Sequence, residues 1–254
     1  SSIFVRWSAA PVSVIAMYRL LFTDILFLPF LMKYAAEIRT LSKKDWGLLF
    51  WSGSALGAHF IFWLSSLRFT PVANSTALLS LVPVLVMTGS FLFFKHRVHR
   101  LGMIGMMVAF TGVLMIGWSD YSVSIRALKG DLFSIIGAIA VAVHMLIGKN
   151  QRSRISAYTY SFFAFFFASL ALAIYNVFWG YSFVDYAPYE WGNFLLLAIV
   201  PTVFGHFLFN WLLKYVQATS VSMAVLGEPI GSTMLAFYFL GEKINALQIA
   251  AGFV

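Results

Sequence analysis

The stretch Thr219–Leu240 reads TSVSMAVLGEPIGSTMLAFYFL and is long enough to cross a bilayer, which takes about 20 apolar residues at ~1.5 Å each. Near its middle stand Glu228 and Pro229. Proline cannot donate to the helical hydrogen-bond ladder and clashes with the carbonyl four residues earlier, so the helix should break at Pro229. A freed carbonyl and a carboxylate at membrane depth are tolerated only where protein or a watery cavity covers them. We therefore predict a broken helix that faces a polar cavity near the membrane midplane.

A second stretch has the same plan. Val72–Phe94 reads VANSTALLSLVPVLVMTGSFLFF, and Pro83 interrupts it at mid-length as Pro229 interrupts the first. His59 and His206, each followed by aromatic residues, occupy matching positions in the two halves with one residue of slippage. Five spans in each half would invert the second half relative to the first, which is the inverted-repeat plan of many transporters. The inversion places His59 toward the outer side and His206 at a mirrored depth toward the inner side.

The composition indicates an all-α polytopic membrane protein. The chain has 254 residues, of which 61% are hydrophobic and only 10% are charged, whereas soluble domains carry about 25% charged residues. The net charge of +8 lies mainly in short loops between spans, so membrane orientation explains it better than nucleic-acid binding does. Cysteine is absent, which excludes disulfides and thiolate metal sites.

Apolar runs predict ten membrane spans. In chain order they are the end of a first span at Ser1–Ser8, then Pro11–Met32, Trp46–Leu67, Val72–Phe94, Leu101–Trp118, Leu132–Gly148, Tyr158–Phe178, Gly192–Leu213, Thr219–Leu240 and the beginning of a tenth at Leu247–Val254. We expect that the first helix is largely absent from this chain and that the tenth is truncated. Residues 1–118 would form the first five-helix repeat and residues 130–254 the second.

Positive charge in the loops predicts the orientation. Alternate loops form two sets, and the richer set carries eleven cationic residues, namely Lys33, Arg39, Lys43, Lys44, Lys95, Arg97, Arg100, Lys149, Arg152, Arg154 and Lys214. The opposite set carries five, namely Arg6, Arg68, Arg126, Lys129 and Lys243. Because cytoplasmic loops are enriched in Lys and Arg, the richer set is predicted to be cytoplasmic. Both termini of the ten-helix protein would then also lie in the cytoplasm, at the inner membrane of the cell.

Three ionisable residues within spans are candidates for coupling or binding. Desolvation favours the neutral form of a carboxylic acid, so Glu228 suits binding and release of a proton, although it could instead be a structural acid beside the helix break. Arg19 could bind a substrate carboxylate or neutralise Glu228. Asp24 could face the same cavity, and it lies roughly 140° around the helix from Arg19, so the two should not pair directly.

Two helix faces are predicted to line the path of a substrate. His59 and Trp63 lie one helical turn apart, as do His206 and Asn210, so each face presents an aromatic ring and a hydrogen-bonding group. Tyr18 is a further candidate for an aromatic wall. The alternative is that the histidines hold helices together, as polar residues in membrane helices often do.

No enzymatic, metal or cofactor motif accompanies these residues. Their spacing matches no ligand pattern such as H-E-x-x-H, and neither a phosphate-binding loop nor a nucleophile elbow is present. We therefore predict no metal, no cofactor and no enzymatic activity.

Several motifs together resemble the drug/metabolite transporter superfamily, of the EamA type. They are the arginine of Ala16-Met17-Tyr18-Arg19-Leu20, the Pro83 segment, the pair Glu228-Pro229, and the turn Leu240-Gly241-Glu242-Lys243 followed by Gly252. The resemblance covers nearly the whole chain and implies ten helices in two inverted repeats and transport of small metabolites. Amino-acid exporters are its best-known members.

The sequence thus predicts a secondary-active transporter that moves a small polar metabolite, with an amino acid favoured, across the cytoplasmic membrane by alternating access. Its partners would be the small-molecule substrate, the lipid bilayer and protons, and the protein would be a monomer or a homodimer. The alternatives are a sugar-nucleotide or drug carrier of the same superfamily, an uncoupled facilitator, and an intramembrane enzyme acting on lipid.

Overall fold

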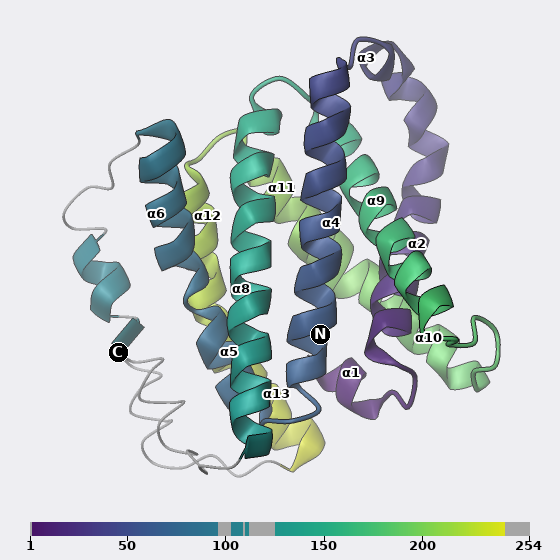
Figure 1. Cartoon of the computed structure of the whole chain (residues 1–254), viewed down its shortest axis with the longest axis vertical. Helices are drawn as coiled ribbons and strands as arrows, with labels where there is room; N and C mark the ends of the chain where they lie inside the picture. The colour runs from purple at the N-terminus through teal and green to yellow at the C-terminus, as the bar shows by residue number, and fades with distance from the viewer. Residues whose placement is uncertain (1, 96–102, 109, 112–124, 242–254) are drawn as a thin grey trace.

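The computed structural model describes residues 2–95, 103–108, 110–111 and 125–241, and this part of the chain is helical (Figure 1). The first half contains α1 (Ser2–Trp7), α2 (Val12–Phe27), the 3₁₀ segment η1 (Leu28–Tyr34), α3 (Ala35–Arg39), α4 (Lys43–Ser66), α5 (Val72–Leu79) and α6 (Val82–Phe94). The second half contains α8 (Ile125–Arg152), α9 (Ala157–Phe178), α10 (Pro188–Leu197), η2 (Ala198–Phe207), α11 (Leu208–Leu212), α12 (Ala218–Met223), η3 (Ala224–Gly227) and α13 (Glu228–Leu240). The predicted spans Leu101–Trp118 and Leu247–Val254 lie mostly or wholly outside the described residues.

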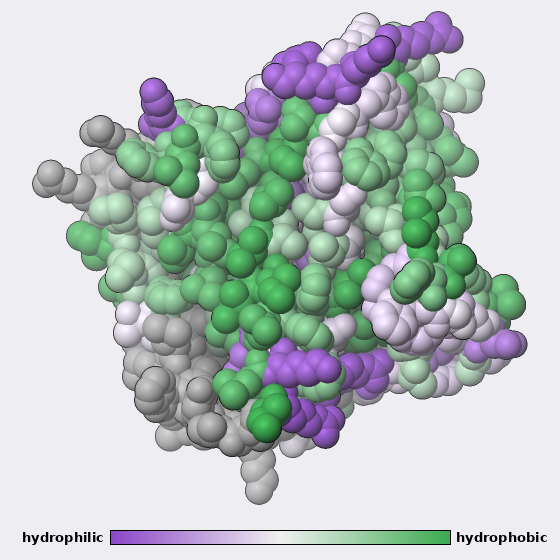
Figure 2. Space-filling view, in the orientation of Figure 1, coloured by the Kyte–Doolittle hydropathy of each residue, from purple (hydrophilic) through white to green (hydrophobic). Residues whose placement is uncertain are grey.

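The described part of the chain contains seven helices, continuous or broken, that are long and apolar enough to cross a membrane. Apolar side chains cover the middle of the face shown in Figure 2, and hydrophilic side chains gather at its top and in a band near its bottom. This distribution is that of a multi-pass membrane protein, because the hydrocarbon core excludes polar side chains.

Both predicted proline breaks are confirmed. The stretch Val72–Phe94 is divided into α5 and α6, with Pro83 at the second residue of α6. The stretch Thr219–Leu240 is divided by the 3₁₀ turn η3, after which α13 begins at Glu228, directly before Pro229. The missing amide hydrogen of each proline removes one helical bond, and the backbone changes its winding just before it.

A third break differs from the prediction of one continuous helix over Gly192–Leu213. Residues Ala198–Phe207 form a π-helical stretch, η2, with Pro201 inside it. The wider winding accommodates a proline that a regular α-helix would exclude, and it continues into α11.

Helix α4 is the centre of the bundle and lies beside α8 and α9. Ser52 of α4 contacts His144 of α8, and His59, about two turns further along α4, contacts the earlier residue Gly137, so α4 and α8 run antiparallel. Gly53 brings α4 so close to α9 that an added Cβ would lie 2.6 Å from the Ala164 carbonyl oxygen. This close approach holds α4 in the position from which it contributes to the site described below.

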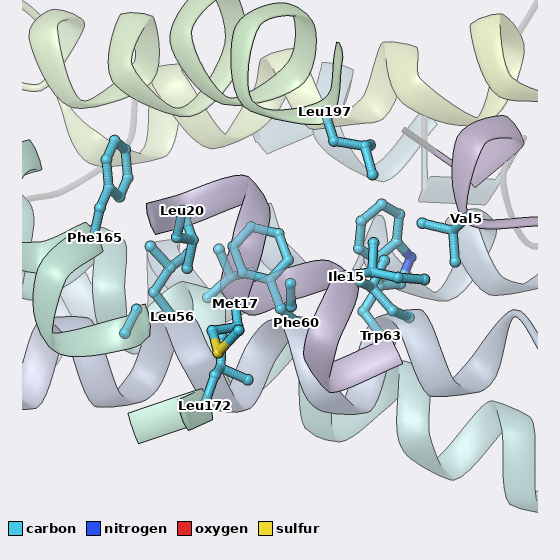
Figure 3. Packing of buried hydrophobic residues seen from close by; sticks show 14 of the residues in the cluster. Val5, Ile15, Met17, Leu20, Leu56, Phe60, Trp63, Phe165, Leu172 and Leu197 are labelled. Atoms are coloured by element: carbon cyan, nitrogen blue, oxygen red, sulfur yellow. The ribbon is translucent and has the colours of Figure 1, made fainter. Parts of the chain in front are cut away.

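Most of the buried apolar side chains form one core around α2, α4, α9 and the α10–η2 junction (Figure 3), and a smaller cluster lies between α4 and α9. Ile15 and Leu20 of α2, Leu56 and Phe60 of α4 and Phe165 of α9 are all fully buried. In a membrane such side chains stabilise the fold through close packing rather than through removal from water, because lipid tails are as apolar as the side chains themselves.

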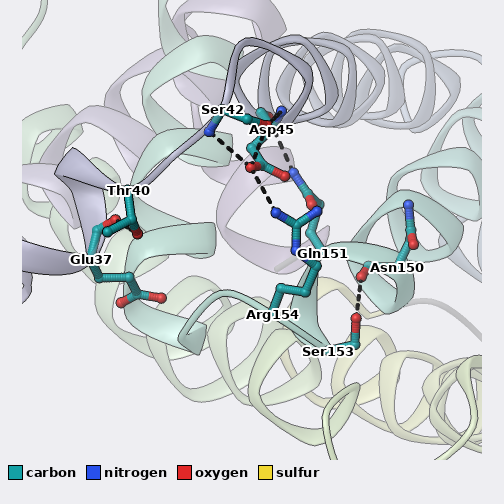
Figure 4. A network of polar contacts seen from close by, with 8 residues as sticks. All are labelled: Glu37, Thr40, Ser42, Asp45, Asn150, Gln151, Ser153 and Arg154. Carbon is teal, nitrogen blue, oxygen red and sulfur yellow. Dashed lines mark hydrogen bonds and ion pairs between the residues drawn. The ribbon is translucent and has the colours of Figure 1, made fainter.

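A polar cluster fixes the N-terminus of α4 (Figure 4). Ser42 Oγ accepts a hydrogen bond from the Asp45 backbone N–H (3.2 Å), and Asp45 Oδ2 accepts one from the Ser42 backbone N–H (2.9 Å), which forms a capping box. Arg154, in the loop after α8, donates to the same carboxylate oxygen at 3.2 Å, and Gln151 Nε2 donates to the Asp45 carbonyl at 3.1 Å. The α8–α9 loop and the start of α4 therefore lie at the same end of the bundle.

Candidate functional site

The helix breaks converge on one cavity of about 270 Å³. Its walls come from α2, α4 and α8 and from the interrupted spans, which contribute Val82 of α6, Pro201 of η2 and Val225 of η3. The polar side chains that line it are Arg19, His59, Trp63, His144, His206, Asn210 and Glu228. The predicted association of the proline breaks with a polar cavity is thus present in the structure.

The guanidinium of Arg19 contacts Thr202 and Phe60, and its Nη atoms are left without a partner among the described residues. Its guanidinium is fully buried, its Nε donates to Thr202 Oγ1 of η2 at 3.0 Å, and its Cζ lies 4.3 Å from the centre of the Phe60 ring. Thr202 in turn donates to the Leu197 carbonyl at 2.8 Å. The Nη1 and Nη2 atoms are buried and make no hydrogen bond to any residue that the structure describes. This free edge has the geometry that binds a carboxylate through two parallel hydrogen bonds.

Glu228 supplies the opposite charge in the same cavity. It is half-buried at the first residue of α13, and it is close enough to Arg19 for an electrostatic interaction. The two side chains nevertheless form no ion pair with each other among the described residues. A cation and an anion that share a cavity without pairing present complementary charges to a third group.

His59 and His206 meet across the cavity. The ring of His59 donates from Nδ1 to the Gly137 carbonyl oxygen at 2.9 Å and stacks on Trp63 at a centroid distance of 5.5 Å. The ring of His206 lies 6.3 Å from that of His59. The two rings therefore converge on the same cavity, and the depths toward opposite sides of the membrane stay a prediction. The Nε1 atom of Trp63 is buried and has no partner in the described part of the chain.

Tyr18 and Asp24, predicted for the same site, do not line the cavity. The Tyr18 hydroxyl donates to the Phe183 carbonyl at 2.5 Å, and its ring stacks on Phe194 at 5.2 Å. Asp24 is almost fully buried, and its carboxylate oxygens have no hydrogen-bond partner among the described residues. Both residues lie on α2 but turn away from Arg19, because neighbours on a helix are about 100° apart and Asp24 is about 140° away.

His144 belongs to the cavity although sequence reasoning did not include it in the binding set. It is 2% exposed and forms a buried cluster with Ser52 of α4 and Tyr160 of α9. His144 has no counterpart in the other half of the sequence, so the internal repeat could not identify it as a cavity residue. The sequence offered only the presence of a histidine within an apolar span.

Comparison with known proteins agrees with the fold. The model of the EamA-like transporter family matches residues 1–118 and 128–254. An uncharacterized transporter of Archaeoglobus fulgidus is 22% identical over 99% of this chain and 86% of its own length. The uncharacterized transporter YetK of Bacillus subtilis is 26% identical over 92% of this chain and 73% of its own length.

Two further proteins are similar to this chain. The pseudopaline exporter CntI of Pseudomonas aeruginosa is 26% identical over 84% of this chain and 73% of its own length. A protein of known crystal structure superposes with a TM-score of 0.75 at 16% identity, over 96% of this chain and 84% of that one. At such low identity the structural likeness establishes the fold alone.

Proposed function

Since the chain belongs to the EamA-like transporter family, we propose that it is a secondary-active transporter that moves a small zwitterionic metabolite, an amino acid, across the cytoplasmic membrane. That the protein is a membrane transporter follows from the family. The class of cargo is inferred from the cavity and its charges.

Arg19 and Glu228, which line one cavity and form no ion pair with each other within the described part of the chain, carry this proposal. An amino acid has a carboxylate that fits the free Nη edge of Arg19 and an ammonium group that fits the Glu228 carboxylate. The solute would thus complete the charge pairing that the described residues leave open. The cavity volume of about 270 Å³ is just below the roughly 300–1,000 Å³ usual for ligand pockets, which favours an amino acid over a sugar nucleotide or a drug.

Transport would be coupled to protons because a proton and the ammonium group of the solute compete for the Glu228 carboxylate. Glu228 binds either a proton or the ammonium group of the solute, and it cannot hold both. A proton gradient across the membrane can therefore drive the release of the solute on one side and its uptake on the other. The similarity to a pseudopaline exporter supports a metabolite as the cargo of this fold.

The proposed architecture has ten helices in two inverted five-helix repeats, over residues 1–118 and 130–254, with both termini in the cytoplasm. In alternating access, the two repeats would rock against each other around the cavity, which opens in turn to each side of the membrane. The family match to two segments of the chain supports the repeat, and the loop charges support the orientation.

Cysteine accessibility tests the orientation. Ser42 caps α4, so the exposed neighbour Lys44 is the better position on the predicted cytoplasmic side, and exposed Asp185 serves for the outside. A Lys44→Cys variant should react with a membrane-impermeant maleimide only after the membrane is opened, and an Asp185→Cys variant should react in intact cells. Labelling in the reverse order would refute the orientation.

A ligand screen tests the cargo. Binding to the folded state raises the unfolding temperature of the purified protein, and the stabilisation grows with the logarithm of the ligand concentration once that concentration exceeds the dissociation constant. One or more free amino acids should stabilise the protein, while sugar nucleotides and simple carboxylic acids should not. Stabilisation by a sugar nucleotide and by no amino acid would favour the alternative carrier of the same superfamily.

A further inference from the structure

The cavity has a second end, which the proposed charge pair does not use. His59 of α4 and Gly137 of α8 meet at the end where Arg19 lies. His144 follows Gly137 along α8 by about 10 Å, because seven residues rise ~1.5 Å each. It lines the same cavity and is 2% exposed.

Hydrogen bonds fix the tautomer of the His144 ring. Its Nδ1 atom lies 2.8 Å from Ser52 Oγ and 3.2 Å from the Ser52 carbonyl oxygen. A carbonyl oxygen can only accept, so Nδ1 carries the hydrogen. Ser52 Oγ then donates to the Tyr160 hydroxyl at 2.5 Å, and that hydroxyl donates to the His144 carbonyl at 3.2 Å. Every proton in this chain of bonds has an acceptor, and Nε2 of the neutral ring is left as an acceptor.

The acceptor Nε2 faces the cavity without a partner. It is buried and makes no hydrogen bond within the part of the chain that the structure describes, although buried polar atoms are nearly always paired. Asn210 lies beside the ring; its Nδ2 donates one of its two hydrogens to Ser161 Oγ at 3.1 Å, and its Oδ1 is a second acceptor. Two neighbouring acceptors suit a ligand group with more than one N–H bond, such as an amide or an ammonium.

We propose that this end of the cavity is a specificity subsite, in which His144 Nε2 recognises a hydrogen-bond donor at the end of an amino-acid side chain. The inference rests on the proposed function, because Arg19 must hold the carboxylate of the same molecule. The substrate class is then narrowed to amino acids whose side chains end in an amide or an ammonium, with glutamine and lysine as representatives. Side chains that end in a methyl group or a carboxylate leave both acceptors unpaired.

Glutamine and methionine provide the matched test, because they are similar in length and differ in the terminal amide. Their dissociation constants are measured by isothermal titration calorimetry on the purified full chain. Glutamine should bind at least about tenfold more tightly, since an unpaired buried acceptor is costly. Equal affinities would overturn the subsite and leave the proposed function standing. Failure of every amino acid to bind the folded protein would overturn the proposed function and this inference with it.

Two variants assign the preference to the His144 cluster. His144→Phe keeps an aromatic ring but removes Nε2, and the ratio of the two affinities should fall to within about twofold of one. Tyr160→Phe removes only the hydroxyl at the end of the hydrogen-bond chain and should lower the ratio part of the way. Tyr189→Phe makes the same change at an exposed tyrosine of α10 and should keep the wild-type ratio.

The variants also separate recognition from a structural role. A folded His144→Phe protein with the wild-type ratio would overturn the proposal. If His144→Phe does not fold, His144→Met, which also lacks Nε2, takes its place, and a wild-type ratio in that folded variant would overturn the proposal.

Discussion

Replacing Arg19 with glutamine is expected to weaken amino-acid binding by roughly 100-fold or more, because removing one partner of a buried charge-assisted pair costs about 2–5 kcal/mol. The guanidinium is fully buried, and its Nη edge has no partner among the described residues, so the edge is available to a carboxylate of the solute. Calorimetric titration of the purified variant with the amino acid that binds the wild type measures the loss.

Graded variants distinguish carboxylate binding from structural support. Arg19→Lys keeps the charge but loses the two parallel hydrogen bonds, so an intermediate loss of about tenfold is expected. Thr202→Val removes the group that orients the guanidinium through Nε and should also cause an intermediate loss. Arg39→Gln makes the matched change at an exposed arginine outside the cavity and should leave binding unchanged. A folded Arg19→Gln protein that binds as the wild type does would show that Arg19 only supports the structure.

Replacing Glu228 with glutamine is expected to abolish uptake driven by a pH gradient in proteoliposomes, while exchange of labelled for unlabelled solute persists. The amide is nearly isosteric but cannot take up a proton in the working pH range, so the variant lacks the group that binds the coupled proton. Its oxygen still accepts a hydrogen bond from the ammonium of the solute, which keeps exchange at saturating concentration with affinity lowered by about tenfold. Both activities are measured as flux of the radiolabelled solute.

The pH dependence of binding provides the accompanying check. In the wild type, affinity should fall as the pH is lowered, because protonation removes the negative charge that binds the ammonium. In Glu228→Gln the affinity should not depend on pH, whereas Asp185→Asn, the same change in the exposed loop before α10, should behave as the wild type does. Uptake that still follows the gradient in Glu228→Gln would remove proton coupling from this residue, and equal loss of uptake and exchange with binding intact would assign it to gating.

Apolar runs and capping residues made most of the helices predictable. The span Tyr158–Phe178 was predicted within one residue of α9, which begins at Ala157 after Ser156 caps its first turn. The breaks at Pro83 and Pro229 were predictable because the lost amide hydrogen and the ring clash are local properties of proline.

The winding after a proline was less predictable. Pro201 carried the same local signal as the other two prolines, yet it lies in a π-helical stretch that continues the helix into α11. Whether a chain breaks or widens at a proline depends on the packing of its neighbours. Here Thr202 of that stretch is tied to Arg19 of α2, a contact between residues far apart in the sequence.

The site was partly predictable from the repeat and from charge. His59 and His206 occupy corresponding positions in the two halves, and the structure brings their rings within 6.3 Å. Arg19 and Glu228 were indicated because an ionisable group at membrane depth requires a polar environment. His144 was not predictable in this way, because its place in the cavity depends on hydrogen bonds to Ser52 and Tyr160 from two other helices.

The central claim is that Arg19 and Glu228 together bind both charges of one amino acid in transit. Its most direct test is competition in counterflow, in which wild-type proteoliposomes loaded with an unlabelled amino acid take up the labelled form. The amide of that amino acid lacks the carboxylate, and the corresponding acid without the amino group lacks the ammonium. We predict that the parent amino acid inhibits labelled uptake at concentrations at least about 100-fold lower than either analogue. Inhibition by either analogue at the same concentration as the parent would contradict the claim.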